Sequence, residues 1–301
     1  MKIAILHSRV KIGAKRGNLR RMNLLIKSVL NNRSDVDVVV LPSYPISGPV
    51  IGYYPPNRIK NAVKHLAERI SNKGSAIGPS IGTLLKWSTE YGIHIIAGPI
   101  IERAGPKLYL AAIHISPMGG VEAKYRKISL TRSERDAGLS PGKSIEVFEV
   151  KGKGSVGIFI DEDLGYPEIF RAIQSREVNI ILGFMLPYDS SYFRMVNDGE
   201  TGLLTMDLDS VLEFLAVRSR ETGLPIILVG GGVEGGHGGN HGSIAFMPTI
   251  PAEPDIGVVR DRILDYNRLD SDMVIDIDTV MSRPRALDRL VFERVLKELC
   301  K

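Results

Sequence analysis

The sequence predicts an α/β fold in which helices pack on β-sheets that contain both parallel and antiparallel strands. Short runs of β-branched residues alternate along the 301-residue chain with longer segments in which apolar residues recur every three or four positions. Runs of the first kind are typical of buried strands and segments of the second kind of amphipathic helices. Their alternation is typical of layered α/β proteins. Two strand-like runs, 144–150 and 155–160, have so few residues between them that they favour an antiparallel pair.

The first half of the chain combines both kinds of segment. Apolar runs predict strands at 3–6, 36–41, 93–98 and 108–116. Apolar residues at helical spacing predict helices at 18–30, 59–70 and 81–91. In the first of these helices, the residues that keep the spacing are Met22, Leu25, Ile26 and Val29. The strand at 36–41 leads into a loop rich in proline and glycine at 42–56.

The second half continues the pattern without a break. Strands are predicted at 144–150, 155–160, 178–182, 226–229 and 243–247, and helices at 168–176 and 205–222. No internal repeat and no linker divides the chain. We therefore expect a single domain over residues 1–301, with a C-terminal helical extension at about 283–301.

The composition is that of an ordinary globular protein, with 44% hydrophobic and 24% charged residues. The net charge of +5 is spread along the chain without a run of five basic residues, so we expect no nucleic-acid partner. The chain has no apolar run of membrane-spanning length and no signal peptide at its start, so we expect a cytoplasmic protein without a membrane partner.

Two residue types are scarce. Cys300 is the only cysteine, which excludes an intramolecular disulfide and a metal site built on paired thiolates. Gln174 is the only glutamine, and scarcity of both types is a weak sign of a thermophilic source.

The segment Gly157–Glu168 is the most informative one for function. An apolar strand runs into the polar turn Asp161–Asp163, and Pro167-Glu168 then opens a helix. α/β enzymes commonly place a nucleophile at such a junction, although an aspartate is a weak one. Asp163 also fits the role of a helix N-cap, which Asp161, at the strand end, fits less well.

Two further segments place polar residues beside strands. Ser43 follows the buried strand and Pro42, either at the carboxyl end of a sheet, where ligands bind, or simply as a turn residue. The segment Lys124–Leu130 is basic and is either a solvated strand edge or the carrier of a buried lysine that could stabilise an oxyanion.

The glycine-rich segment 230–242 follows the strand at 226–229 and precedes the one at 243–247. A dinucleotide-binding loop would open a helix here, so a flexible hairpin-like loop is the better interpretation. His237 and His241 lie four positions apart, a spacing that suits a metal only on a helix. The glycines oppose a helix, so we expect no metal site.

Together these segments resemble the nitrilase superfamily, the carbon–nitrogen hydrolases, over roughly residues 1–282. The segment Tyr125–Leu130 resembles the family's lysine motif, and Gly157–Glu168 resembles its nucleophile motif. The segment Arg218–Thr222 resembles a family helix, and Asp272–Asp278 resembles the family's last strand. The resemblance implies an αββα sandwich, with two mixed sheets between layers of helices.

The resemblance also implies a Glu-Lys-Cys triad that cleaves amides, nitriles or carbamoyl groups. In the family the glutamate is the general base, the lysine stabilises the tetrahedral intermediate and the cysteine forms a thioester. Here Lys127 matches the lysine, but Ser43 stands at the position of the glutamate and Asp161 at that of the cysteine. Glu134 is a candidate for a second family glutamate, although its spacing to Pro141-Gly142 is one residue too long.

These departures bear on the chemistry. Serine is no base near neutral pH, and attack by Asp161 on an amide would form a mixed anhydride, a steeply unfavourable product. Buried together, Asp161 and Lys127 would form an ion pair that neutralises the charge an oxyanion needs. We therefore expect a protein without ordinary amidase activity, a pseudoenzyme that binds a small molecule or has a regulatory or structural role.

The alternative is an active hydrolase of altered mechanism, in which Asp161 activates water and Lys127 is the electrophile. A chain that carries substitutions of an active parent, and a metal or nucleotide site in the 230–242 loop, are weaker alternatives. No cofactor is expected. The expected partners are an amide-like small molecule and, through helices that pair across a two-fold axis, a second copy of the chain. From their loop positions, Tyr44, Tyr166, Phe184 and Tyr188 are expected to shape the pocket.

Overall fold

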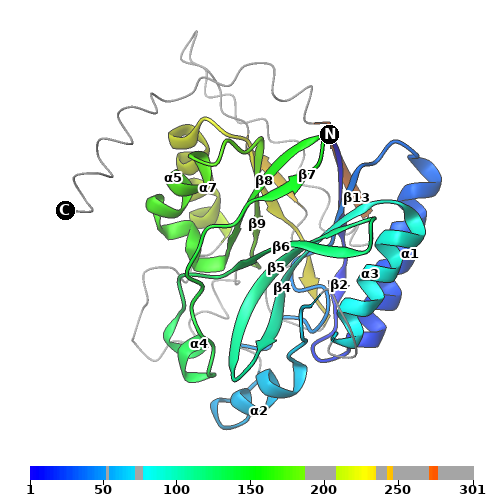
Figure 1. The fold of residues 1–301 in the computed structure, drawn as a ribbon. Coiled ribbons are helices and arrows are strands. Elements are labelled where there is room, and N and C mark those ends of the chain that lie inside the picture. Colours follow the sequence, from blue (N-terminus) through cyan, green and yellow to red (C-terminus); the bar gives the residue numbers. More distant parts are fainter. Residues whose placement is uncertain (52–53, 72–76, 187–207, 235–242, 247–270, 277–301) are drawn as a thin grey trace.

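Two β-sheets lie face to face between two layers of helices, so the predicted αββα sandwich is confirmed (Figure 1). The computed structural model describes residues 1–51, 54–71, 77–186, 208–234, 243–246 and 271–276. The expected helical extension at 283–301, Cys300, Tyr188, His237 and His241 lie outside these ranges. Among the described helices, none combines the length and the apolar character needed to cross a membrane.

The larger sheet has six strands in the order β13-β1-β3-β4-β5-β6. Their bounds are β1 Lys2–His7, β3 Val38–Val40, β4 His94–Ala104, β5 Lys107–Ser116, β6 Gly120–Arg126 and β13 Ser271–Asp276. Strands β1, β3 and β4 are parallel, whereas β5, β6 and β13 join by antiparallel pairing. The strand expected at 272–278 is therefore an edge of this sheet.

The smaller sheet has five strands in the order β12-β10-β9-β8-β7. Their bounds are β7 Phe148–Val150, β8 Gly154–Ile160, β9 Ile180–Phe184, β10 Ile226–Val229 and β12 Ile244–Phe246. Strands β8, β9 and β10 are parallel, and β7 and β12 are antiparallel to their neighbours. The predicted antiparallel pair of β7 and β8 is confirmed, and the sheet is mixed.

The helices cover the outer faces of the sheets. Helices α1 Lys15–Asn32 and α3 Pro79–Tyr91 pack on the larger sheet. Helices α5 Pro167–Gln174 and α7 Leu208–Thr222 pack on the smaller sheet. Helix α2 Pro56–Leu66 packs at the end of β4 and β5, and short helix α4 Arg132–Asp136 follows β6.

The alternation of side chains along the strands explains the layers. In β1, Ile3 and Ile5 face the smaller sheet, whereas Ala4 and Leu6 face α1 and α3. In β8, Ile158 faces the larger sheet and Phe159 faces α5. Because successive side chains of a strand point to opposite faces, a strand that is apolar throughout must be covered on both sides.

Two short strands and the short helix α4 were not expected from the sequence, and one strand is longer than expected. Strand β6 extends Lys124–Arg126 back to Gly120. Strands β2 Arg9–Val10 and β11 Gly232–Val233 form a separate two-stranded parallel sheet. The glycine-rich segment thus begins with a strand. The hairpin-like pairing of its flanking strands β10 and β12 is confirmed. Two-residue strands are too short for a periodicity signal.

Candidate active site

Three of the four candidate side chains follow directly on strands, and the structure brings two of the three together. Ser43 lies after β3, Lys127 after β6 and Asp161 after β8. Lys127 and Asp161 come from different sheets, and Lys127 Nζ lies 3.7 Å from Asp161 Oδ2. The hydroxyl of Ser43 instead donates to the carbonyl of Val229.

Lys127 is a buried cation surrounded by carboxylates. Tyr125 faces the core between the sheets, and Lys127, two positions on, has a side chain with no exposed surface. Its Nζ donates to Glu134 Oε1 at 2.6 Å and to Glu162 Oε2. Burial alone would lower the pKa of Lys127, but the charges of Glu134, Glu162 and Asp161 outweigh it and raise the pKa well above the ordinary value. The solvated-edge interpretation is therefore wrong for this lysine.

Glu134 is held by the start of α4 in a capping box. Its Oε2 accepts from Thr131 N at 2.8 Å, and its own backbone N–H donates to Thr131 Oγ1 at 3.1 Å. This arrangement leaves Oε1 for Lys127. Burial raises the pKa of Glu134, and Lys127 acts against that rise. The candidate with the uncertain spacing thus does reach the lysine.

Asp161 sits at the tip of a sharp turn. Its φ is 47°, a left-handed value that Asp tolerates better than most residues. The hydroxyl of Tyr44, which was expected to shape the pocket, donates to Asp161 Oδ2. Burial raises the pKa of Asp161 to about 8, against the opposing effect of Lys127. The expected ion pair of Asp161 with Lys127 is present at 3.7 Å. The raised pKa favours the neutral acid of Asp161 at pH 7, so this pair alone does not balance the charge of the lysine.

Glu162 contributes a further negative charge beside Lys127. No role was predicted for it from the sequence. It follows Asp161 in the 3-10 turn Asp161–Gly165, and its carboxylate contacts Lys127 directly. Position 43, where the family resemblance implies a glutamate, carries a serine and supplies no carboxylate. The only signal in the sequence was the acidic run Asp161–Asp163 itself, in which the middle residue had no assigned role.

Ser43 is fully buried and serves to join the two sheets. Its Oγ donates to Val229 O at 3.0 Å, and its backbone N–H donates to Gly230 O at 3.2 Å. Both acceptors lie at the end of β10, in the other sheet. The turn-residue interpretation therefore describes Ser43 better than a role beside Lys127.

Asp163 ties the turn Asp161–Gly165 to the segment that carries Lys127. Its Oδ1 accepts from Ser129 N at 2.7 Å and from Ile128 N at 3.2 Å, and its Oδ2 accepts from Tyr125 Oη at 2.8 Å. The N-cap of α5 is Tyr166, so the N-cap prediction for Asp163 is wrong. The carboxylate holds backbone donors of a different segment, a contact that no local pattern encodes.

The carboxylates of Glu134, Asp161 and Glu162 have oxygens within 4.8 Å of one another. A hard cation could use such oxygens. The ammonium of Lys127 already contacts all three, so a metal ion would have to share the space with a buried positive charge. The geometry thus favours an ion cluster completed by the chain's own cation.

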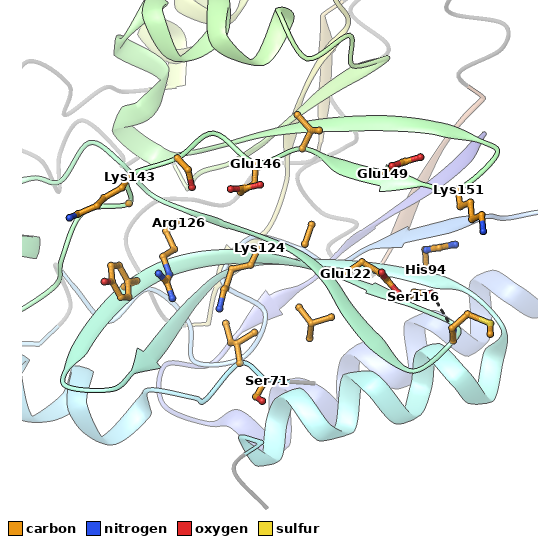
Figure 2. Close-up of a pocket in the computed structure, with 18 of the residues that line it drawn as sticks. Ser71, His94, Ser116, Glu122, Lys124, Arg126, Lys143, Glu146, Glu149 and Lys151 are labelled. Carbon is orange, nitrogen blue, oxygen red and sulfur yellow. Dashed lines mark hydrogen bonds between the residues drawn. The ribbon is translucent and has the colours of Figure 1, made fainter. Parts of the chain in front are cut away.

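A groove of about 1130 Å³ runs along β6 and the segment 141–151 (Figure 2), and none of the residues of the Lys127 cluster lines it. Lys124 and Arg126 point into it, and both bind the buried carboxylate of Glu102. Acidic side chains, Glu122, Glu146 and Glu149, also line it.

Phe184, expected at the pocket, is instead fully buried in the core between the sheets.

A family model described as carbon-nitrogen hydrolase matches residues 2–209. No curated protein sequence matches the chain. Similar solved structures include Nit3 of Saccharomyces cerevisiae, a member of branch 10 of the nitrilase superfamily, at 18% identity, TM-score 0.61 and 82% coverage of both chains. A mutant amidase of Nesterenkonia AN1, from the same superfamily, has 18% identity, TM-score 0.62 and covers 98% of this chain and 97% of its own.

A carbon-nitrogen hydrolase from Helicobacter pylori G27 has 16% identity and TM-score 0.61, with 82% of this chain and 81% of that chain covered. At these identities the similarity supports the fold. In other structures of the Nesterenkonia amidase, acrylamide or the acetamide moiety of fluoroacetamide is joined to the active-site cysteine.

Proposed function

The chain belongs to the carbon–nitrogen hydrolase family, and we propose that it is a member that binds an amide-like small molecule without cleaving it through a covalent intermediate. The observation that carries the proposal is Asp161. It occupies the turn after β8, where the family resemblance places the cysteine, and burial raises its pKa to about 8. A neutral carboxylic acid is a poor nucleophile at physiological pH.

The neighbours of Asp161 support the same proposal. The ammonium of Lys127 donates to the carboxylates of Glu134 and Glu162, so its charge is largely matched before any substrate oxyanion forms. The hydroxyl of Ser43 is occupied by Val229 O. A neutral carboxyl group both donates and accepts, which complements the carbonyl and the N–H of an amide.

A paired activity screen tests this proposal. The wild-type chain and the Ser43→Glu/Asp161→Cys variant are given the same panel of amides, nitriles and carbamoyl compounds, including acrylamide and fluoroacetamide, and ammonia release is measured. We expect release only from the variant. Because Ser43 is buried, Asp161→Cys alone is a second variant, and melting temperatures establish that each chain is folded.

Covalent trapping gives an independent readout. In a Cys300→Ser background, Asp161→Cys should gain the mass of one fluoroacetamide-derived acetamide group, whereas the parent chain should gain none. Ammonia release by the wild-type chain, or a covalent acyl group on it, would contradict the proposal.

A second candidate function is hydrolysis with Asp161 as general base on water. The same pKa of about 8 favours it, because an efficient general base titrates near the working pH, and Lys127 lies 3.7 Å away as electrophile. It requires turnover that rises with pH through about 8 and disappears in Asp161→Asn. If neither the wild type nor that variant releases ammonia from any compound of the panel, this function is excluded.

A further inference from the structure

A cavity of about 1630 Å³ at the start of α1, between α1, α2 and the end of β4, has a strongly cationic lining. None of the residues of the Lys127 cluster takes part in it. The basic residues that line it come from four segments of the chain, and they are Lys15, Arg16, Arg58, His65, Arg69 and Arg103. One carboxylate, Glu68, lines it with them.

Glu68 does not neutralise the arginines. Its side chain is 2% exposed, and its Oε1 accepts from Lys15 Nζ at 2.6 Å and from Ser80 Oγ at 2.7 Å. The carboxylate is thus committed to one lysine and to the first turn of α3. The cationic charge that remains belongs to the arginines.

Those arginines have no acidic partner in the described part of the chain. Arg16, Arg58 and Arg69 make no ion pair there, and Arg103 donates to the carbonyl of Lys64. The groove of Figure 2 is different, because Glu102 binds both Lys124 and Arg126 and further glutamates line that groove. Single exposed arginines are ordinary on protein surfaces. Four that line one cavity whose only carboxylate among the described residues, Glu68, is bound to Lys15 create a positive potential that favours anions.

The chemistry of the donors indicates which anion. Guanidinium groups form paired hydrogen bonds with phosphate oxygens. Arginines from the start of α1, from α2, from the segment after α2 and from β4 surround a space larger than one phosphate group. Among the described residues the backbone N–H groups of Arg16 and Gly17 also have no acceptor. We propose that this cavity binds a small molecule that carries two or more linked phosphate groups, independently of the function of the Lys127 site.

Isothermal titration calorimetry of the full chain with tripolyphosphate tests the proposal. We expect one site per chain, at least about tenfold weaker binding of inorganic phosphate, and at least about tenfold weaker tripolyphosphate binding by Arg58→Gln/Arg69→Gln, since each lost charge-assisted bond accounts for roughly a factor of ten. The matched control is Arg20→Gln/Arg33→Gln, which removes the same charge from exposed arginines outside the cavity and should keep wild-type affinity.

Four results would overturn the proposal. They are no binding by the wild type, equal weakening in both double variants, equal affinity for phosphate and tripolyphosphate, and much tighter binding of a short RNA than of tripolyphosphate. All four substituted arginines are exposed. Melting temperatures without ligand should therefore match the wild type, and any loss of binding then reports on the cavity.

Discussion

Asp161 has the conformation and the surroundings of a residue on which a site depends. Its backbone is left-handed at the end of β8, a cost that persists in proteins only where neighbouring structure fixes it. Here Tyr44, also at positive φ, donates to its carboxyl group. Two strained residues from different sheets therefore meet in one hydrogen bond, which indicates a fixed arrangement rather than a relaxed loop.

The raised pKa of Asp161 predicts how stability depends on pH. The unfolded chain ionises this group near 3.8 and the folded chain near 8, so between these values the folded state holds the extra proton and its stability falls as pH rises. In Asp161→Asn this contribution disappears. From pH 5 to pH 8 we expect the wild type to lose unfolding free energy relative to Asp161→Asn, and above pH 8 we expect the difference between the two chains to stay constant. Urea denaturation at each pH measures this difference. A difference that stays constant over this range would contradict the assignment.

Lys127 permits a second prediction at this scale. Lys127→Met leaves Glu134, Glu162 and Asp161 without their cation, so we expect a loss of about 3–5 kcal/mol in unfolding free energy, measured by urea denaturation at pH 7. Lys124→Met is the control. Lys124 is 28% exposed and its partner Glu102 retains Arg126, so we expect about 0–1 kcal/mol. Equal losses would show that the Lys127 cluster is not a buried ionic unit.

At the scale of elements, the site depends on how the strands end. The lysine follows β6 in one sheet and the aspartate follows β8 in the other. Asp163 joins these ends through the backbone N–H groups of Ile128 and Ser129. These partly buried backbone donors need acceptors, so this carboxylate links the two sheets at the site.

The smaller sheet also depends on close packing against its helices. A Cβ at Gly183 in β9 would lie 2.0 Å from the ring of Phe159, which packs against Phe170 of α5. We expect Gly183→Ala to reduce the free energy of unfolding by about 1–3 kcal/mol. A Cβ at Gly82 in α3 would lie 3.9 Å from the nearest atom. Gly82→Ala should therefore raise the free energy of unfolding by about 1 kcal/mol, because alanine has the higher helix propensity.

Urea denaturation of both alanine variants decides this point. Adding Phe159→Leu to Gly183→Ala should recover part of the loss if the ring is the obstacle. An unchanged loss in the double variant would mean that the backbone of β9, not the ring, resists the added methyl group.

For the whole molecule, the helical layers offer the surface through which a second copy would bind. Val217 on α7 is 45% exposed and Tyr166, directly before α5, is 47% exposed. The expected pairing of helices across a two-fold axis would bury these two side chains if it used this layer, and closed two-fold dimers are the commonest assemblies. We therefore propose a homodimer through the α5/α7 layer.

Sedimentation velocity tests the dimer. Val217→Asp should shift the protein from dimer to monomer, because it would bury an unpaired charge at the interface. Leu24→Asp, at a 64% exposed position on α1 in the opposite layer, should leave the dimer intact. A monomeric wild type, or dissociation by Leu24→Asp alone, would contradict the proposed surface.

The sequence by itself determined the order of the main elements, the mixed sheets and, through family resemblance, the αββα layers. It also placed Ser43 and Asp161 at strand ends, and the family resemblance singled out Lys127. These features follow from local periodicity, since apolar alternation sets which face of a strand is buried and where the strand stops. Helix and strand ends differed by a few residues, as in β7, which begins at Phe148 rather than at 144.

Only the tertiary structure decided which of these residues share one space. It placed Glu162 and Tyr44 on the Lys127–Asp161 pair and turned Ser43 toward Val229 in the other sheet. It also gathered arginines from four segments into one cavity. Such contacts join positions up to 186 residues apart. Burial and charge at the site depend on how the two sheets pack, and no local pattern in the sequence encodes that packing.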